Sequence, residues 1–162
     1  MQHYKAYLKD EAATAALGLQ LAHAMAPGMA IYLHGDLGAG KTALTRSLLH
    51  AAGHQGHVRS PTYTLAEPYR IQLDGREVGV IHFDLYRMSS PEEFLDAGFR
   101  EEFNADNICI VEWPEKAEGV LPKPDLAIFL NVNGDGRDVE LQGFSDLGQL
   151  CLDRLHFAPN LG

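Results

Sequence analysis

Basic residues are scarce in this chain of 162 residues: 13 lysines and arginines stand against 22 aspartates and glutamates, a formal net charge of −9 at pH 7. A protein that covers a broad stretch of nucleic acid needs a basic face, so this charge argues against such binding. It leaves open an action on nucleic acid through partner proteins. Long apolar runs are also missing, because Pro27 and Gly28 interrupt the longest one, over residues 26–33. We therefore expect no membrane span.

Cysteine is nearly absent too. Cys109 and Cys151 are the only two cysteines, and their wide separation fits neither a metal site nor a redox motif. Both stand among apolar residues, so we expect buried free thiols. The first residues lack the apolar core of a secretion signal, from which we expect the chain to stay in the cytoplasm.

The sequence does contain a glycine-rich loop that matches the phosphate-binding pattern G-x-x-x-x-G-K-[ST] at every fixed position. The loop is Gly35-Asp36-Leu37-Gly38-Ala39-Gly40-Lys41-Thr42. Residues 29–34 before it are apolar and β-prone, and residues 43–52 after it are typical of a helix. The order strand, loop, helix predicts that the loop N–H groups bind a polyphosphate at a helix N-terminus. Lys41 would then contact the β- and γ-phosphates, and the Thr42 hydroxyl would bind Mg²⁺.

The rest of the chain predicts an α/β fold. Further strands are indicated over residues 3–8, 63–73, 77–86, 108–111, 125–132 and 138–143. Further helices are indicated from residue 10, from residue 90 and over residues 145–155. We expect a P-loop NTPase-like mixed sheet with a parallel centre, antiparallel hairpins and helices on both faces. The length suggests one domain, over residues 1–155, with residues 156–162 as a C-terminal tail.

Two carboxylates end apolar strands, at the edge where α/β proteins collect ligands. Asp84 is the leading candidate for the acidic residue of a magnesium shell. Glu112 could hold Mg²⁺ directly or through water, or orient the attacking water, and its position in the sequence leaves these roles open. Thr62 follows Ser60 and Pro61 in a loop segment comparable to the one in which GTPases place a threonine that senses γ-phosphate and Mg²⁺.

The motifs that the chain lacks limit which nucleotide base it could bind. The chain has no Asn-Lys-x-Asp and no Asp-x-x-Gly after the glycine loop, which disfavours a Ras-type GTPase. Four linked motifs instead resemble the TsaE (YjeE) family in order and spacing, over nearly the whole chain. They are the glycine loop, Ser60-Pro61-Thr62-Tyr63-Thr64, His82-Phe83-Asp84-Leu85-Tyr86-Arg87 and Val111-Glu112-Trp113-Pro114-Glu115.

This resemblance implies a small bacterial ATPase with ATP and Mg²⁺ as cofactors. Members of the family are needed to form threonylcarbamoyladenosine on tRNAs that read codons beginning with A. By this resemblance we expect the chain to act with the TsaB–TsaD complex, whose TsaD subunit transfers the threonylcarbamoyl group, and to reach tRNA only through these partners. ATP hydrolysis is expected to be slow without the partners and to reset the complex between turnovers.

The resemblance also assigns residues. Lys41 and Thr42 bind phosphate and Mg²⁺, Asp84 and Glu112 supply the magnesium and hydrolytic carboxylates, and Thr62 belongs to a switch-like loop. By the same pattern the whole glycine loop binds ATP.

Three further positions follow from the family pattern. Glu11 and Arg137 are similar to family positions near the nucleotide, and Trp113 adjoins the site. Two alternative functions remain: a small-molecule kinase, and a nucleotide-dependent binding switch without significant turnover. A kinase usually needs arginines in a lid over the phosphates, and the arginines of this chain do not cluster in sequence.

Overall fold

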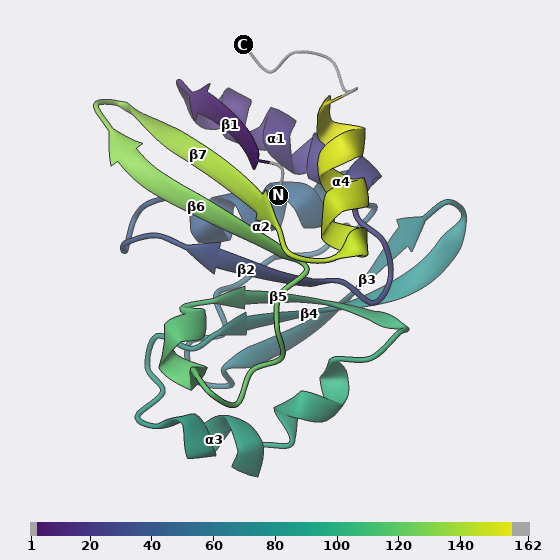
Figure 1. The fold of residues 1–162 in the computed structure, drawn as a ribbon, viewed down its shortest axis with the longest axis vertical. Helices are drawn as coiled ribbons and strands as arrows, with labels where there is room; N and C mark the ends of the chain where they lie inside the picture. Colours follow the sequence, from purple (N-terminus) through teal and green to yellow (C-terminus); the bar gives the residue numbers. More distant parts are fainter. Residues whose placement is uncertain (1–2, 157–162) are drawn as a thin grey trace.

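The computed structural model of the protein describes residues 3–156. Within them, seven strands form one mixed sheet with helices on both faces (Figure 1). The strands are β1 (His3–Leu8), β2 (Ala30–His34), β3 (Ala66–Leu73), β4 (Arg76–Asp84), β5 (Asn107–Glu112), β6 (Leu126–Asn133) and β7 (Gly136–Gly143). The helices are α1 (Glu11–Ala24), α2 (Lys41–Ala51), α3 (Pro91–Asp96) and α4 (Asp146–His156), with the 3₁₀ turns η1 (Phe99–Glu102) and η2 (Pro114–Ala117).

The strand order is β1-β7-β6-β2-β5-β4-β3. The four central strands β6, β2, β5 and β4 are parallel. The hairpins β6–β7 and β3–β4 are antiparallel, and β1 pairs antiparallel with β7 at the edge. This arrangement confirms the predicted fold class. The assignment of residues 1–155 to one domain stays a prediction, and the predicted tail lies outside the described residues except for His156, which ends α4.

Turn chemistry sets where β3 and β4 begin and end. Asp74 and Gly75, with φ of 51° and 77°, form the two-residue turn whose twist suits a hairpin. β3 begins at Ala66 rather than at residue 63, because Leu65 donates its N–H to Pro61 O at 3.1 Å and the chain turns there. β4 ends at Asp84 rather than at residue 86, because the Asp84 carboxylate accepts the N–H of Tyr86 at 3.1 Å.

The larger apolar cluster lies between the sheet and the helices α1, α2 and α4. Leu17 of α1, Leu44 of α2 and Leu152 of α4 have no exposed surface, and they share this cluster with Ile31 and Leu33 of β2. Burying each such side chain favours folding by roughly 1.5–3 kcal/mol. This packing holds α2, and with it the glycine loop, against one face of the sheet (Figure 1).

A smaller, aromatic cluster covers the opposite face. The Phe83 ring of β4 contacts the rings of Phe94, Phe99 and Phe103, with centroid distances of 5.2–5.8 Å. These side chains come from α3, η1 and the segment after it, so the aromatic cluster holds the short helical elements against β4. Alternate residues of β2, β4 and β5 therefore face different clusters, as the pleat requires.

Both cysteines are buried free thiols, as predicted. Burial raises the pKa of Cys109 to about 12 and that of Cys151 to about 12. Neither thiol is therefore available as a thiolate at neutral pH. Among residues 3–156, no helix is long and apolar enough to cross a membrane.

Candidate functional site

The glycine loop, residues 35–42, runs from the end of β2 into α2. Gly40 caps α2 with φ of 105°, in the left-handed region that favours glycine. The helix begins at Lys41, so Lys41 and Thr42 lie in its first turn, where backbone N–H groups have no helical partner. At Gly35 a Cβ atom would lie 2.6 Å from the Leu130 carbonyl oxygen. Only glycine therefore lets the loop pass this close to β6.

The side chain of Lys41 is buried beneath the glycine loop. Its Nζ donates hydrogen bonds to the carbonyl oxygen of Gly35 and, at 3.5 Å, to that of Asp36. It also lies 3.9 Å from the centroid of the Trp113 ring. Burial lowers the pKa of this ammonium group, and the carboxylates of Glu112 and Asp84 oppose that shift. An anion brought to the loop would favour the charged form.

Thr42 and Glu112 face each other across the site. The Thr42 hydroxyl lies 3.3 and 3.2 Å from the two carboxylate oxygens of Glu112, to which it donates, and 3.4 Å from the Ser60 hydroxyl. Glu112 is only 2% exposed. Its Oε2 atom also lies 2.6 Å from Nε2 of His82, which is completely buried.

Asp84 lies beside Glu112, because the two residues are register partners at the carboxyl ends of the parallel strands β4 and β5. Burial raises the pKa of the Asp84 carboxyl, and the nearby charge of Glu112 raises it further. Two carboxylates in one partly desolvated place repel each other, and a bound cation relieves that repulsion. The hydroxyl and carboxylate oxygens of Thr42, Glu112 and Asp84 are ligands of the kind that Mg²⁺ prefers, so the site fits this ion.

A cavity of about 280 Å³ joins these groups. Its lining includes six loop residues from Leu37 to Thr42, together with Ser60, Asp84, Glu112 and Trp113. The structure thus brings together four of the predicted catalytic and metal-binding residues, namely Lys41, Thr42, Asp84 and Glu112. Thr62 does not line this cavity: its backbone N–H and its hydroxyl lie 2.8 and 3.4 Å from the carbonyl oxygen of Ser60.

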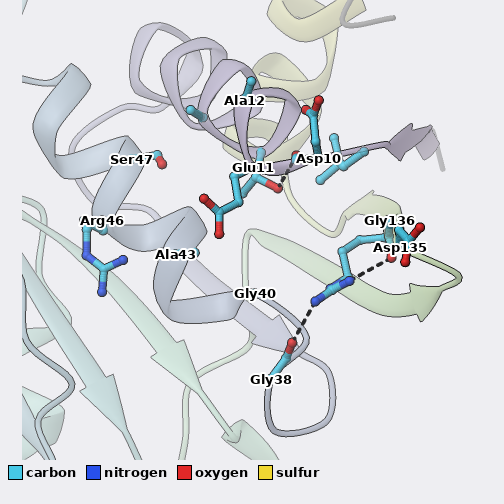
Figure 2. Close-up of a pocket in the computed structure, with 14 residues that line it drawn as sticks. Asp10, Glu11, Ala12, Gly38, Gly40, Ala43, Arg46, Ser47, Asp135 and Gly136 are labelled. Carbon is cyan, nitrogen blue, oxygen red and sulfur yellow. Dashed lines mark hydrogen bonds between the residues drawn. The ribbon is translucent and has the colours of Figure 1, made fainter.

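A second cavity, of about 670 Å³, adjoins the glycine loop on the side of α1. It shares Gly38, Gly40 and Ala43 with the first cavity and is bordered by α1, α2 and the β6–β7 turn. Figure 2 shows how its charged side chains are placed, with Glu11 on α1 and Arg46 on α2. The predicted nucleotide residues Glu11 and Arg137, far apart in the sequence, both line this cavity.

Arg137 has a second set of contacts, with the loop itself. Its guanidinium group donates to the carbonyl oxygens of Ala39 at 3.0 Å and Gly38 at 3.1 Å. These bonds draw two loop carbonyls toward β7. Asp10, the N-cap of α1, accepts the N–H of Ala13 at 2.9 Å and so begins the helix that carries Glu11.

Some polar residues that contact or line the site were given no role from the sequence, among them His82, Ser60 and Arg46. Their sequence signals differ. Ser60 stands two residues before Thr62 in one of the four motifs, whereas Arg46 stands between polar residues and gives no signal. His82 occupies an inward position of β4, on the same face as the buried residues Val78 and Val80, and a polar residue at such a position indicates a partner across the sheet.

The fold and the site together define a P-loop NTPase-like α/β protein, with its candidate ligand site at the carboxyl ends of the parallel strands. A sequence model described as "Threonylcarbamoyl adenosine biosynthesis protein TsaE" matches residues 8–139. The chain belongs to this family, which functions in tRNA threonylcarbamoyladenosine biosynthesis. The family predicted from the four sequence motifs is thereby confirmed.

The relatives match over most of their length. The chain is 42% identical over 154 residues to the tRNA threonylcarbamoyladenosine biosynthesis protein TsaE of Haemophilus influenzae, covering 92% of this chain and 95% of the relative. It is 37% identical over 136 residues to the Bacillus subtilis TsaE, covering 83% and 82% of the two chains. The crystal structure of Bacillus subtilis YdiB superposes with a TM-score of 0.75 at 27% identity, covering 96% of this chain and 95% of that one.

Proposed function

We propose that this chain is a Mg²⁺-dependent ATPase that serves threonylcarbamoyladenosine formation on tRNA by acting on the TsaB–TsaD complex. The observation that carries the ATPase is the convergence of Lys41, Thr42, Asp84 and Glu112 on one cavity at the N-terminus of α2. Family membership supports the link to tRNA modification.

The residues of the site suggest how the phosphates would be held. The N–H groups at the start of α2 would bind the phosphate oxygens, favoured by the helix dipole. The Lys41 ammonium would exchange the Gly35 carbonyl for the β- and γ-phosphates, since it already lies at the loop. Arg137 would keep the Gly38 and Ala39 carbonyls turned away from the phosphates.

Thr42, Asp84 and Glu112 would hold the magnesium ion. When bound, Mg²⁺ neutralises developing charge on the transferred phosphoryl group. One of the two carboxylates, most simply Glu112 at the floor of the cavity, would orient the attacking water or accept its proton. Trp113 and the buried walls would limit the access of bulk water to this point.

The larger cavity beside the loop has room for the nucleoside part of ATP. Glu11 offers acceptor oxygens and Arg46 offers donors at its borders. Because this cavity adjoins the phosphate cavity at Gly38 and Gly40, one nucleotide could occupy both. The net charge of −9 supports contact with tRNA only through TsaB–TsaD, and we place this activity in the cytoplasm.

ATP hydrolysis by the chain alone, with TsaB–TsaD, and with TsaB–TsaD plus tRNA tests the proposal. We expect slow turnover that the partner complex stimulates, and a loss of both turnover and ATP affinity in Lys41→Ala. Lys123→Ala, at an exposed lysine that lines neither of these two cavities, is the matched control. Turnover that depends on a small-molecule acceptor would support a kinase instead, and nucleotide binding without turnover under every condition would support a binding switch.

A further inference from the structure

His82 lies beneath the carboxylates at the boundary between the polar site and the apolar core. It is two residues before Asp84 in β4, and its register partner in β5 is Ile110, two residues before Glu112. The ring therefore reaches diagonally across two parallel strands to Oε2 of Glu112, at 2.6 Å. Both side chains are removed from solvent, with exposed fractions of 0% and 2%.

The surroundings of the ring determine which nitrogen carries the proton. Nδ1 of His82 is buried and has no hydrogen-bond partner within the described residues. A proton on Nδ1 would leave an unpaired N–H donor in the core, which is costly. A proton on Nε2 instead makes a charge-assisted hydrogen bond to the Glu112 carboxylate. His82 is accordingly the donor and Glu112 the acceptor.

This donor restricts the orientation of Glu112. The His82 N–H, on the neighbouring strand β4, binds one carboxylate oxygen, and the Thr42 hydroxyl contacts the carboxylate from α2. A carboxylate held at two points cannot rotate freely, so its remaining lone pairs keep one direction. That direction is the cavity, because Glu112 lines it.

We propose that His82 is a positioning residue that fixes the Glu112 carboxylate for magnesium binding and catalysis, an inference that rests on the proposed ATPase function. Residues that orient a metal ligand from behind typically change metal affinity or activity by about 10- to 100-fold when they are replaced. Replacing a buried histidine that only fills the core would change the stability of the protein and leave metal affinity and kcat unchanged.

Three substitutions separate these roles. His82→Gln keeps an N–H donor at nearly the reach of Nε2, whereas His82→Leu keeps volume without a donor. His82→Asn is polar but too short to reach Glu112. Val80→Ala, in the same strand and on the same face, shortens a completely buried side chain without touching the site and controls for lost stability.

Two measurements are made on each folded variant: steady-state ATP hydrolysis, and calorimetric ADP affinity with Mg²⁺ and with EDTA. We expect His82→Leu to lower kcat by about 10- to 100-fold with a much smaller change in KM. It should also reduce the gain in ADP affinity that Mg²⁺ provides, while affinity in EDTA stays near that of the parent. His82→Gln should keep most of the parent kcat and most of the gain in ADP affinity that Mg²⁺ provides. Val80→Ala should keep both quantities near the parent values. If the leucine variant does not fold, His82→Asn against His82→Gln gives the same contrast.

A double variant tests whether His82 acts through Glu112. His82→Leu combined with Glu112→Gln should be no slower than Glu112→Gln alone, because the orientation of an absent charge no longer matters. Additive losses in kcat, or equal effects of His82→Gln and His82→Leu on Mg²⁺-dependent ADP affinity, would overturn the positioning role. A parent protein that binds no nucleotide would instead overturn the proposed ATPase function.

Discussion

The Lys41 ammonium lies over the Trp113 ring, 3.9 Å from the ring centroid. Trp113 directly follows Glu112 and holds a left-handed backbone with φ of 58°, a conformation uncommon for a bulky residue. Its ring also lies 5.0 Å from that of Tyr86. The indole is thus held between Lys41 of the glycine loop and the segment after β4, and a change at Lys41 must alter its surroundings.

We expect Mg-ADP or Mg-ATP to change the fluorescence of Trp113, the single tryptophan of the chain, because phosphate draws the Lys41 charge away from the ring. The measurement is a nucleotide titration monitored by emission, with affinity determined separately by calorimetry. Lys41→Ala, which removes the cation, should shift the starting emission. An unchanged signal at nucleotide concentrations where calorimetry shows saturation would contradict the prediction.

Glu112→Gln and Asp84→Asn should behave differently. Removing the Glu112 charge while keeping its size should lower kcat by roughly tenfold to a thousandfold, with ADP binding retained, since the group acts mainly in the transition state. If Asp84 is the firmer magnesium ligand, raising Mg²⁺ should partly restore Asp84→Asn. Hydrolysis by both variants across a Mg²⁺ series measures this. Glu112→Gln working at the parent rate, with and without TsaB–TsaD, would exclude a catalytic Glu112.

Arg137→Gln should weaken nucleotide binding by releasing the glycine loop. Two charge-assisted hydrogen bonds to Gly38 and Ala39 are lost, and because the group is half-buried we expect a loss of about 1 kcal/mol in stability. ADP affinity should fall by about tenfold, which corresponds to a similar free energy. Arg137→Lys should recover little, because an ammonium lacks the fork that spans both carbonyls. Urea unfolding and calorimetry provide both numbers, with Arg76→Gln, at an exposed arginine of β4, as the control. An ADP affinity in Arg137→Gln equal to that of the parent would contradict the role of Arg137 in holding the glycine loop.

His34 should make the protein sensitive to acid. Its ring is half-buried and stacks on Phe129 at 4.6 Å, and burial lowers the pKa of His34 below the ordinary value of 6.5. As pH falls below 6.5, the unfolded chain takes up this proton before the folded one, so stability decreases with falling pH. The sign is the reverse for a histidine whose pKa is raised.

His34→Gln removes this titration. Urea unfolding at pH 7.5 and pH 5.5 should show a smaller loss of stability on acidification in His34→Gln than in the parent. His23→Gln, at an exposed histidine, controls for the removal of one imidazole. Equal losses in the parent and in His34→Gln would show that His34 does not link stability to pH.

The sequence by itself determined the local features of this protein. The glycine loop, the Asp74-Gly75 turn and the existence of the strands β4 and β5 depend on residues close together in the chain, where backbone conformation and hydrophobic alternation act directly. Asp84 and Glu112 could be chosen because parallel strands collect their carboxyl ends at one edge. The order of the four motifs was enough to predict the family.

Only the tertiary structure decided which distant residues meet. The parallel pairing of β6 with β2 is nonlocal, so the sequence showed the β6–β7 hairpin but not its place beside the loop. That pairing brings Arg137 to Gly38 and Ala39. The turn at Pro61–Leu65 directs Thr62 to the Ser60 carbonyl and leaves Ser60 at the cavity. His82 is matched to Glu112 only by the register of β4 and β5, because a shift of one residue would turn its side chain to the other face of the sheet.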